Sequence, residues 1–178
     1  MNLIKKNFQF RLARKIEINQ IMRFIKLYWK KKNSLYGRNK KIFEYEYCYN
    51  GRVNFMIAIN KKNKKINAIM GFIPYSKNTK NLHICGSMLL VKPNIKFPFL
   101  GIETMKNMLE KIQPKSYCGI GTNSLNLIPL IEKFFKRYTS KMVHHYFLNQ
   151  KIKNFKIANI KKNSKYNFNS KKIFYEQI

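Results

Sequence analysis

The sequence predicts an α/β fold with a mixed central sheet flanked by helices, and three observations support this prediction. Segments with helical periodicity and segments rich in β-forming residues follow one another along residues 16–148. Two strand-like segments flank a short polar turn, as in a β-hairpin. After the hairpin, single strands and helices alternate, and such β–α–β connections need helices packed on the faces of a sheet.

The first predicted helix spans residues 16–32, where apolar side chains recur at helical spacing and a lysine-rich last turn suits the helix dipole. Its apolar face is formed by Ile18, Ile21, Met22, Ile25 and either Tyr28 or Trp29. Residues 33–52 are broken by Gly37 and Gly51, which predicts a loop with a short helix around Ile42 to Tyr47.

A β-hairpin is predicted from residues 53–60 and 65–73, which are apolar and flank the polar turn NKKNKK. A third strand follows within residues 81–93 and is ended by Pro93.

The remaining elements alternate. Residues 102–112 have apolar positions at helical spacing, and Pro114 stops that helix. A short buried strand is predicted over 116–123, a second helix over 124–138 and a last strand over 142–149.

We predict one main domain over residues 1–149, long enough to bury a core without disulfides. Residues 150–178 differ, because Lys, Asn and Ser dominate and apolar residues are isolated. This C-terminal extension either adds a strand or two to the core or is poorly ordered.

The chain is strongly basic, with 37 Lys and Arg against 7 Asp and Glu and a formal charge of +30. Such an excess is typical of proteins that bind nucleic acid or an anionic membrane. However, lysine is spread along the chain beside Asn, Ile, Phe and Tyr, which AT-rich codons encode, and arginine is rare. This favours codon bias over adapted nucleic-acid binding. Either origin predicts salt-sensitive, non-specific adhesion to nucleic acid.

Nothing in the sequence resembles a membrane span of about 20 apolar residues, and the basic N-terminus has no apolar core of a secretory signal. A cytoplasmic protein is therefore expected. Cys48, Cys85 and Cys118 are scattered singly. This predicts buried, reduced thiols and no disulfide framework or metal site.

The order of elements, with VKP ending a strand before a loop and a helix, resembles the GCN5-related N-acetyltransferase (GNAT) superfamily. More narrowly, WKKKNSLYGRNKKIFEYEY followed by NFMIAI, IMGFIPYS and PKSYCGIGTN is similar to acyltransferase-like proteins of bacterial surface-polysaccharide gene clusters. The resemblance covers roughly residues 16–148. It implies an acyl-CoA N-acyltransferase fold and acetyl-CoA or another acyl-CoA as co-substrate.

In that family the loop after the fourth strand carries Arg/Gln-x-x-Gly-x-Gly/Ala, whose backbone N–H groups hold the coenzyme A pyrophosphate. Setting Gly101 on the last glycine places Lys96 on the first position and Phe99 on the middle glycine. Pro98 lacks an N–H, and a ring at Phe99 can fill the phosphate space, so a working coenzyme site and a structural turn both stay open. The cofactor-binding residues implied are Val91, Lys96, Phe99, Gly101 and Asn123.

The family also has a helical tyrosine that protonates the leaving thiolate, and the matching position here falls near Ile131, which has no proton to give. The thiolate can leave without it, at the loss of a general acid's contribution. His144 and His145 adjoin on a predicted strand and so point to opposite faces. The catalytic group stays open, with His83, His145 and Tyr146 as candidates.

The function implied by the resemblance is acyl transfer from acyl-CoA to an amine or hydroxyl of a sugar or sugar nucleotide, in surface-polysaccharide synthesis. The alternative is a catalytically lapsed protein of the same fold, acting as a binding or accessory protein with affinity for polyanions. Phe99 and Ile131 distinguish the two. A third hypothesis, an unrelated RNA-binding protein, would need clustered arginines and exposed aromatics on one sheet face, which the sequence does not indicate.

Overall fold

The computed structural model describes residues 3–29, 34–75, 81–119, 127–136 and 138–140. The chain divides into two units, 1–137 and 138–178, and every helix and strand described below belongs to the first. The strand predicted over 142–149 and the domain boundary predicted after residue 149 lie outside the described residues. They stay predictions.

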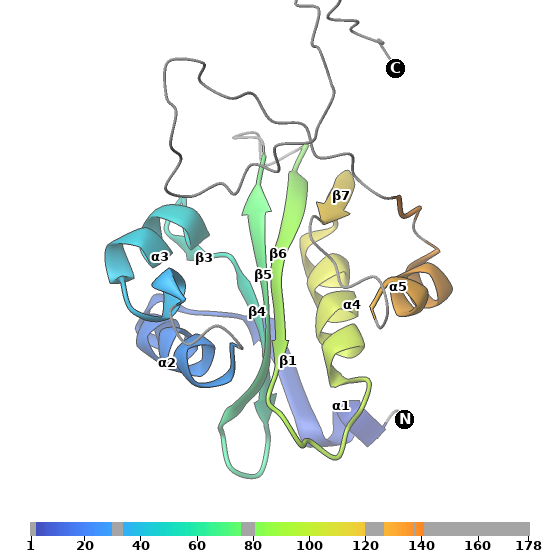
Figure 1. Cartoon of the computed structure of the whole chain (residues 1–178), viewed down its shortest axis with the longest axis horizontal. Helices are drawn as coiled ribbons and strands as arrows, with labels where there is room; N and C mark the ends of the chain where they lie inside the picture. The colour runs from blue at the N-terminus through green and yellow to red at the C-terminus, as the bar shows by residue number, and fades with distance from the viewer. Residues whose placement is uncertain (1–2, 30–33, 76–80, 120–126, 137, 141–178) are drawn as a thin grey trace, which may run out of the picture. The chain divides into compact units, whose positions relative to one another are not determined.

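A five-stranded mixed sheet forms the centre of the first unit, with strand order β1-β4-β5-β6-β7 (Figure 1). Neighbouring strands are antiparallel, except that β6 and β7 are parallel. A separate small hairpin is formed by β2 (Cys48–Tyr49) and β3 (Arg52–Val53). The strands of the main sheet are β1 (Phe8–Leu12), β4 (Phe55–Asn60), β5 (Ile66–Pro74), β6 (His83–Val91) and β7 (Ser116–Gly119).

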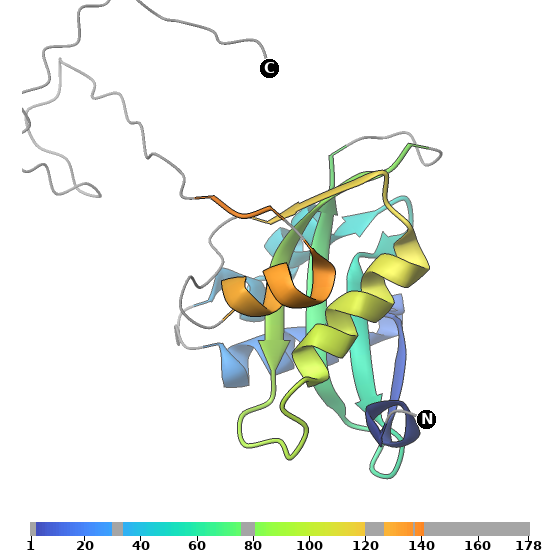
Figure 2. The ribbon, with the colours of Figure 1, turned by 90° about the vertical axis from the view of Figure 1, so that its right-hand side faces the viewer.

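Helices cover both faces of the sheet, which confirms the predicted fold class. One face carries α2 and α3 and is called the α2/α3 face here, while α4 lies on the other, the α4 face, with α5 beside it (Figures 1 and 2). Two single 3-10 turns, η1 (Lys15–Glu17) and η2 (Leu35–Gly37), flank α2. The helices are α1 (Leu3–Asn7), α2 (Ile18–Tyr28), α3 (Lys40–Tyr47), α4 (Leu100–Ile112) and α5 (Ile128–Phe135). No described helix is long and apolar enough to cross a bilayer.

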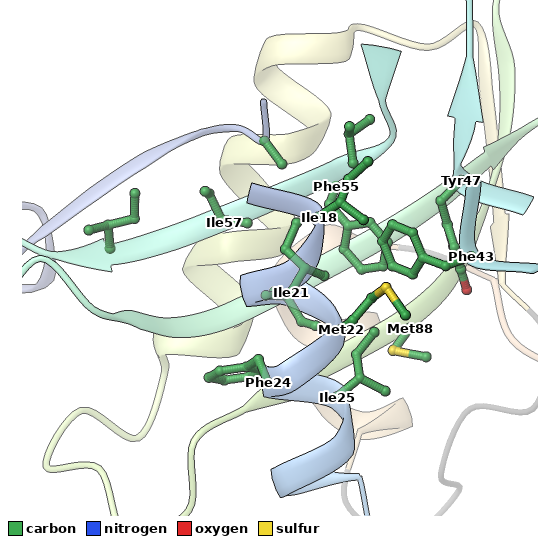
Figure 3. Packing of buried hydrophobic residues seen from close by; sticks show 14 residues of the cluster. Ile18, Ile21, Met22, Phe24, Ile25, Phe43, Tyr47, Phe55, Ile57 and Met88 are labelled. Carbon is green, nitrogen blue, oxygen red and sulfur yellow. The ribbon is translucent and has the colours of Figure 1, made fainter. Parts of the chain in front are cut away.

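The α2/α3 face is covered by one large hydrophobic cluster (Figure 3). The four aliphatic and methionine positions predicted for the first helix are all buried there, together with Phe24, and Tyr28 and Trp29 pack against its margin. The short helix α3 begins where the Asn39 side chain accepts a hydrogen bond from the Ile42 amide (3.1 Å). It adds the ring of Phe43, which stacks on that of Phe55 of β4 with the ring centroids 5.5 Å apart.

The N-terminal residues form α1 and β1, which add to the predicted elements, and Phe8, Phe10 and Leu12 alternate with polar residues as in a strand. One expectation was wrong. The strand predicted as buried over 116–123 is described over 116–119 as β7, which is mostly exposed. Among the described strands it lies at the edge of the sheet, where only β6 pairs with it.

Candidate cofactor and acceptor site

Strand β6 has an irregularity at its centre. On the β5 side, Gly71 pairs with Met88 and Phe72 with Gly86, so Ser87 is an extra residue, a β-bulge. On the other side the described pairing with β7 runs from His83–Ser116 to Gly86–Gly119. The bulge therefore directly follows the last paired residue, and backbone groups at Ser87 are displaced from the regular ladder.

The loop between β6 and α4 is held in place by alternate side chains. Ile95 and Phe97 pack against the cluster around Phe8, and the Phe8 and Phe97 rings are 5.0 Å apart. Lys96, between them, is exposed. The loop leads into the first turn of α4, whose amides lack intrahelical acceptors and carry a partial positive charge. These amides and Lys96 can attract an anionic group.

Phe99 is the residue before α4 and has φ −95°, an ordinary conformation for a side chain larger than glycine. Its ring is 47% exposed and lies 5.8 Å, centroid to centroid, from that of Phe134 in α5. The ring therefore packs toward α5 instead of burying itself in the loop. Glu103 in the first turn of α4 is acidic, and it opposes an added anion there.

Gly101 has a packing reason to be glycine. A Cβ at this position would lie 3.1 Å from Val91 Cγ2, so α4 approaches β6 closely here. The structure thus brings together two of the five implied cofactor residues, Val91 and Gly101, and places Lys96 and Phe99 in the adjoining loop. Asn123 lies outside the described residues.

On the α2/α3 face, β6 and β7 place four titratable or polar side chains opposite one another in two pairs. Cys85 on β6 pairs with Cys118 on β7. On its other side Cys85 pairs with Ile73 of β5, and because Ile73 belongs to the α2/α3 cluster, the two cysteines lie on that face. His83 is the partner of Ser116, and its Nδ1 lies 2.8 Å from the Ser116 hydroxyl. This places the candidate base His83 on the sheet with a partner, whereas His145 and Tyr146 lie outside the described residues.

Tyr75, the residue after β5, lies beside both pairs, and the sequence alone did not single it out. Its amide donates to the His83 carbonyl (2.8 Å), and its hydroxyl lies 3.0 Å from Cys118 Sγ. Cys118 is exposed, so the prediction of buried thiols was wrong for this residue. Among the described residues, no three His, Cys, Asp or Glu side chains gather closely enough to hold a metal ion.

Tyr47 is a second tyrosine that the sequence did not single out. It is buried at the end of α3, where the Ser87 hydroxyl of the bulge donates to its oxygen (3.1 Å) and the Tyr36 ring lies 5.3 Å away. Burial raises the pKa of Tyr47 to about 12. The phenol therefore stays neutral at physiological pH and cannot serve as a base.

Tyr117 lies on the opposite, α4 face, at the end of the β6–β7 pairing. A Cβ built on Gly86 would collide with the Tyr117 hydroxyl oxygen, so the ring occupies the space that a side chain at position 86 would need. A phenol O–H is thereby placed beside the bulge. Ile131, at the position where the family resemblance expects a tyrosine, lies half-buried on α5.

A cavity of about 390 Å³ opens at the end of the sheet away from the β6–α4 loop. Its walls come from the end of β1, the β2–β3 hairpin, the end of β5 and the end of α4, and are mostly apolar. Arg14, Lys15 and Arg52 add positive charge, so this cavity suits a group with an apolar body and a negative charge.

Comparison with known proteins gives a fold match only through structure. No family model matches the sequence, and no curated protein matches it significantly. An aminoglycoside acetyltransferase from an uncultured soil metagenomic sample, solved with trehalose, is 11% identical, with a TM-score of 0.59 over 82% of this chain and 98% of that one. Aminoglycoside N-acetyltransferase AAC(6')-Iy, solved with coenzyme A, is 6% identical, with a TM-score of 0.57 over 79% and 94%.

A Trypanosoma brucei acetyltransferase is also similar, with 11% identity and a TM-score of 0.51 over 79% of this chain and 100% of its own. The protein has the acyl-CoA N-acyltransferase fold of the GCN5-related N-acetyltransferases.

Proposed function

We propose that the protein is an acyl-CoA-dependent acyltransferase. The observation that carries this proposal is the path of β6, which pairs in parallel with β7, has a bulge at Ser87 and then leads through the loop 92–99 into the first turn of α4. AAC(6')-Iy, which shares the fold, was solved with coenzyme A and with a bisubstrate analogue of coenzyme A and acetylneamine.

Coenzyme A would be held through its phosphates by Lys96 and by the first-turn amides of Gly101 and Ile102, since the Leu100 and Glu103 amides already donate to the Phe97 and Phe99 carbonyls. Pro98 has no N–H, so this cradle has one donor fewer than the family pattern. Phe99, unlike Pro98, has a backbone N–H, and its ring packs toward Phe134. The loop therefore fits a phosphate group, with fewer donors than a loop with two glycines.

Acyl transfer would proceed by direct attack of an amine or hydroxyl on the thioester carbonyl carbon. The new bond forms as the C–S bond breaks, the carbonyl oxygen being polarised by backbone N–H groups near the bulge. Tyr117 is our proposed source of the proton that the thiolate takes, because Ile131 has none. His83 lies on the opposite face of the sheet from Tyr117 and four residues before the bulge. It is our proposed acceptor of the proton lost by the nucleophile, and this proton would reach it through water molecules.

For the acceptor we propose a sugar or sugar nucleotide. Two solved structures of this fold hold trehalose and sisomicin, and the sequence resembles proteins of surface-polysaccharide gene clusters. The α2/α3 face of β6 and β7 offers hydroxyl and imidazole groups at His83, Ser116 and Tyr75, which are suited to hydrogen bonds with sugar hydroxyls.

A catalytically lapsed binding protein is the second candidate, and Ile131 is the observation that favours it. If Tyr117 does not supply the proton, transfer loses the contribution of a general acid, and a lapsed protein would bind acyl-CoA without accelerating its transfer. Release of free coenzyme A from acetyl-CoA, followed with a thiol reagent in the presence of amino sugars and sugar nucleotides, distinguishes the two. Binding without acceptor-dependent release would show the lapsed protein.

The first experiment is calorimetric titration with acetyl-CoA at low and high salt, with ATP as a polyanion control. We expect binding that persists at high salt and is tighter than that of ATP. Lys96→Ala should weaken it about three- to tenfold, as for the loss of one charged contact. Lys111→Ala is the matched control, because it removes an equally exposed lysine at the other end of α4. Binding that disappears with salt, or equal effects of both variants, would contradict the proposal.

A further inference from the structure

Two of the three cysteines, 33 positions apart, lie directly opposite each other in the sheet. Cys85 on β6 and Cys118 on β7 are register partners in the parallel pair. Partners of this kind project to the same face, and neighbouring strands lie about 4.8 Å apart. This spacing falls within the Cα separation of about 4.4–6.8 Å that disulfides span.

Tyr75 brings the two sulfur atoms to one place. Its hydroxyl lies 3.0 Å from Cys118 Sγ, and the neighbouring thiols Cys118 and Cys85 both raise the pKa of this phenol. Cys118 is exposed, whereas Cys85 is 8% exposed. A small reagent can therefore reach Cys118 first. Cys48 lies on a different element, at the C-terminal end of α3.

We propose that Cys85 and Cys118 are a site of reversible oxidation by a hydroperoxide. The Cys118 sulfur attacks one peroxide oxygen, the O–O bond breaks, and Cys118 becomes a sulfenic acid as the first water (from hydrogen peroxide) leaves. Cys85 then attacks the Cys118 sulfur, the S–S bond forms, the S–O bond breaks and a second water leaves. Two thiols and one hydrogen peroxide thus give one disulfide and two waters.

The bridge would join β6 to β7 one residue before the last described pair and two before the bulge at Ser87. The sheet, and not the bridge, would fix the distance between the two strands. A disulfide whose geometry is set in this way is easier to reduce wherever it departs from the ideal. This suits a transient modification in a reducing compartment more than a permanent structural bond. The inference does not depend on acyl transfer.

The test uses the reduced full-length protein, treated with a slight excess of hydrogen peroxide after removal of reductant. We expect the titratable thiols to fall from three to one, and dithiothreitol to restore all three. Cleavage after Lys and Arg places the cysteines on separate peptides, 42–52, 81–96 and 116–133, so mass spectrometry identifies the pair directly. The product should join 81–96 to 116–133 within one chain.

Cys48→Ser is the matched control and should still form the bridge, whereas Cys85→Ser and Cys118→Ser should not. Circular dichroism of the reduced variants checks that they fold. A bridge to Cys48, a bridge between two chains, or stable oxidation of Cys118 without a bridge would overturn the inference. Three free thiols after treatment would overturn it as well.

Discussion

The two faces of the sheet are built differently. The α2/α3 face is one continuous cluster that also contains hydroxyl, thiol and imidazole groups, each with a partner, such as Tyr47 with Ser87 and His83 with Ser116. The α4 face is divided into two smaller apolar clusters and is shaped by two glycines, Gly86 under Tyr117 and Gly101 against Val91. Close contact between a glycine and a side chain is found on both faces, because a Cβ on Gly71 would lie 2.9 Å from the Phe55 ring of the α2/α3 face. Hydrogen-bonded pairs of polar side chains distinguish the α2/α3 face among the described residues.

Breaking the close contact should have the largest effect. Gly86→Ala puts a methyl group into the Tyr117 hydroxyl and should destabilise the protein by about 2–4 kcal/mol, measured by urea unfolding. Combining it with Tyr117→Leu should recover much of that loss, because the second change removes the obstructing ring. A Gly86→Ala variant as stable as the wild type would show that shape does not govern the α4 face.

Removing the ion pair between Glu17, the residue before α2, and Arg11 of β1 should have the next largest effect. Glu17 is buried and accepts hydrogen bonds from Arg11 Nη1 and from the Arg14 amide, both at 2.8 Å. Glu17→Gln should lose about 2 kcal/mol of unfolding free energy, because the buried carboxylate loses its charge-assisted hydrogen bond with the partly exposed Arg11. Glu44→Gln is the control, because its exposed pair with Lys40 (3.8 Å) contributes about 0.5 kcal/mol or less.

The same pair predicts a pH dependence. The hydrogen bond from Arg11 lowers the pKa of Glu17 from 4.5 to about 2. A lowered folded-state pKa stabilises the protein above 4.5, and this stabilisation is lost as pH falls from 4.5 to about 2. Unfolding measured across this range should show a smaller acid loss in Glu17→Gln than in the wild type. Equal losses would assign the acid sensitivity to other groups.

The smallest of these effects should come from one hydroxyl on the α2/α3 face. Tyr47→Phe keeps the ring but leaves the Ser87 hydroxyl without this partner, which should lower the unfolding free energy by about 1 kcal/mol. Tyr45→Phe on the same helix is the control, because Tyr45 is 88% exposed and should have almost no effect. If the two changes are equivalent, paired polar groups contribute nothing to this face.

Periodicity was sufficient to predict most of the fold. The buried face of α2, the β4–β5 hairpin and α4 all followed from apolar spacing, because each buries one side against the sheet. The segment that forms β1 has a clear alternation of apolar and polar residues, but its basic charge was the property that drew notice in the sequence. The exposure of β7 was not predictable, because residue spacing does not say which strand lies at the edge.

The candidate site was predictable only where it is local. The loop 92–99 and Gly101 belong to one short stretch, so a motif could locate them. Tyr47 with Ser87, Tyr75 with Cys118 and Gly86 with Tyr117 come from distant segments. Their contacts depend on strand register and on the bulge, and neither leaves a pattern in the sequence.

The contact between Gly86 and Tyr117 also has an evolutionary consequence. These positions lie 31 residues apart in the sequence but compete for the same volume, so position 86 cannot gain a side chain while the ring at 117 stays. A lineage that acquires a side chain at 86 should first have exchanged the ring at 117 for something smaller. Among descendants of a common ancestor, a side chain at position 86 is therefore expected only together with a small residue at position 117.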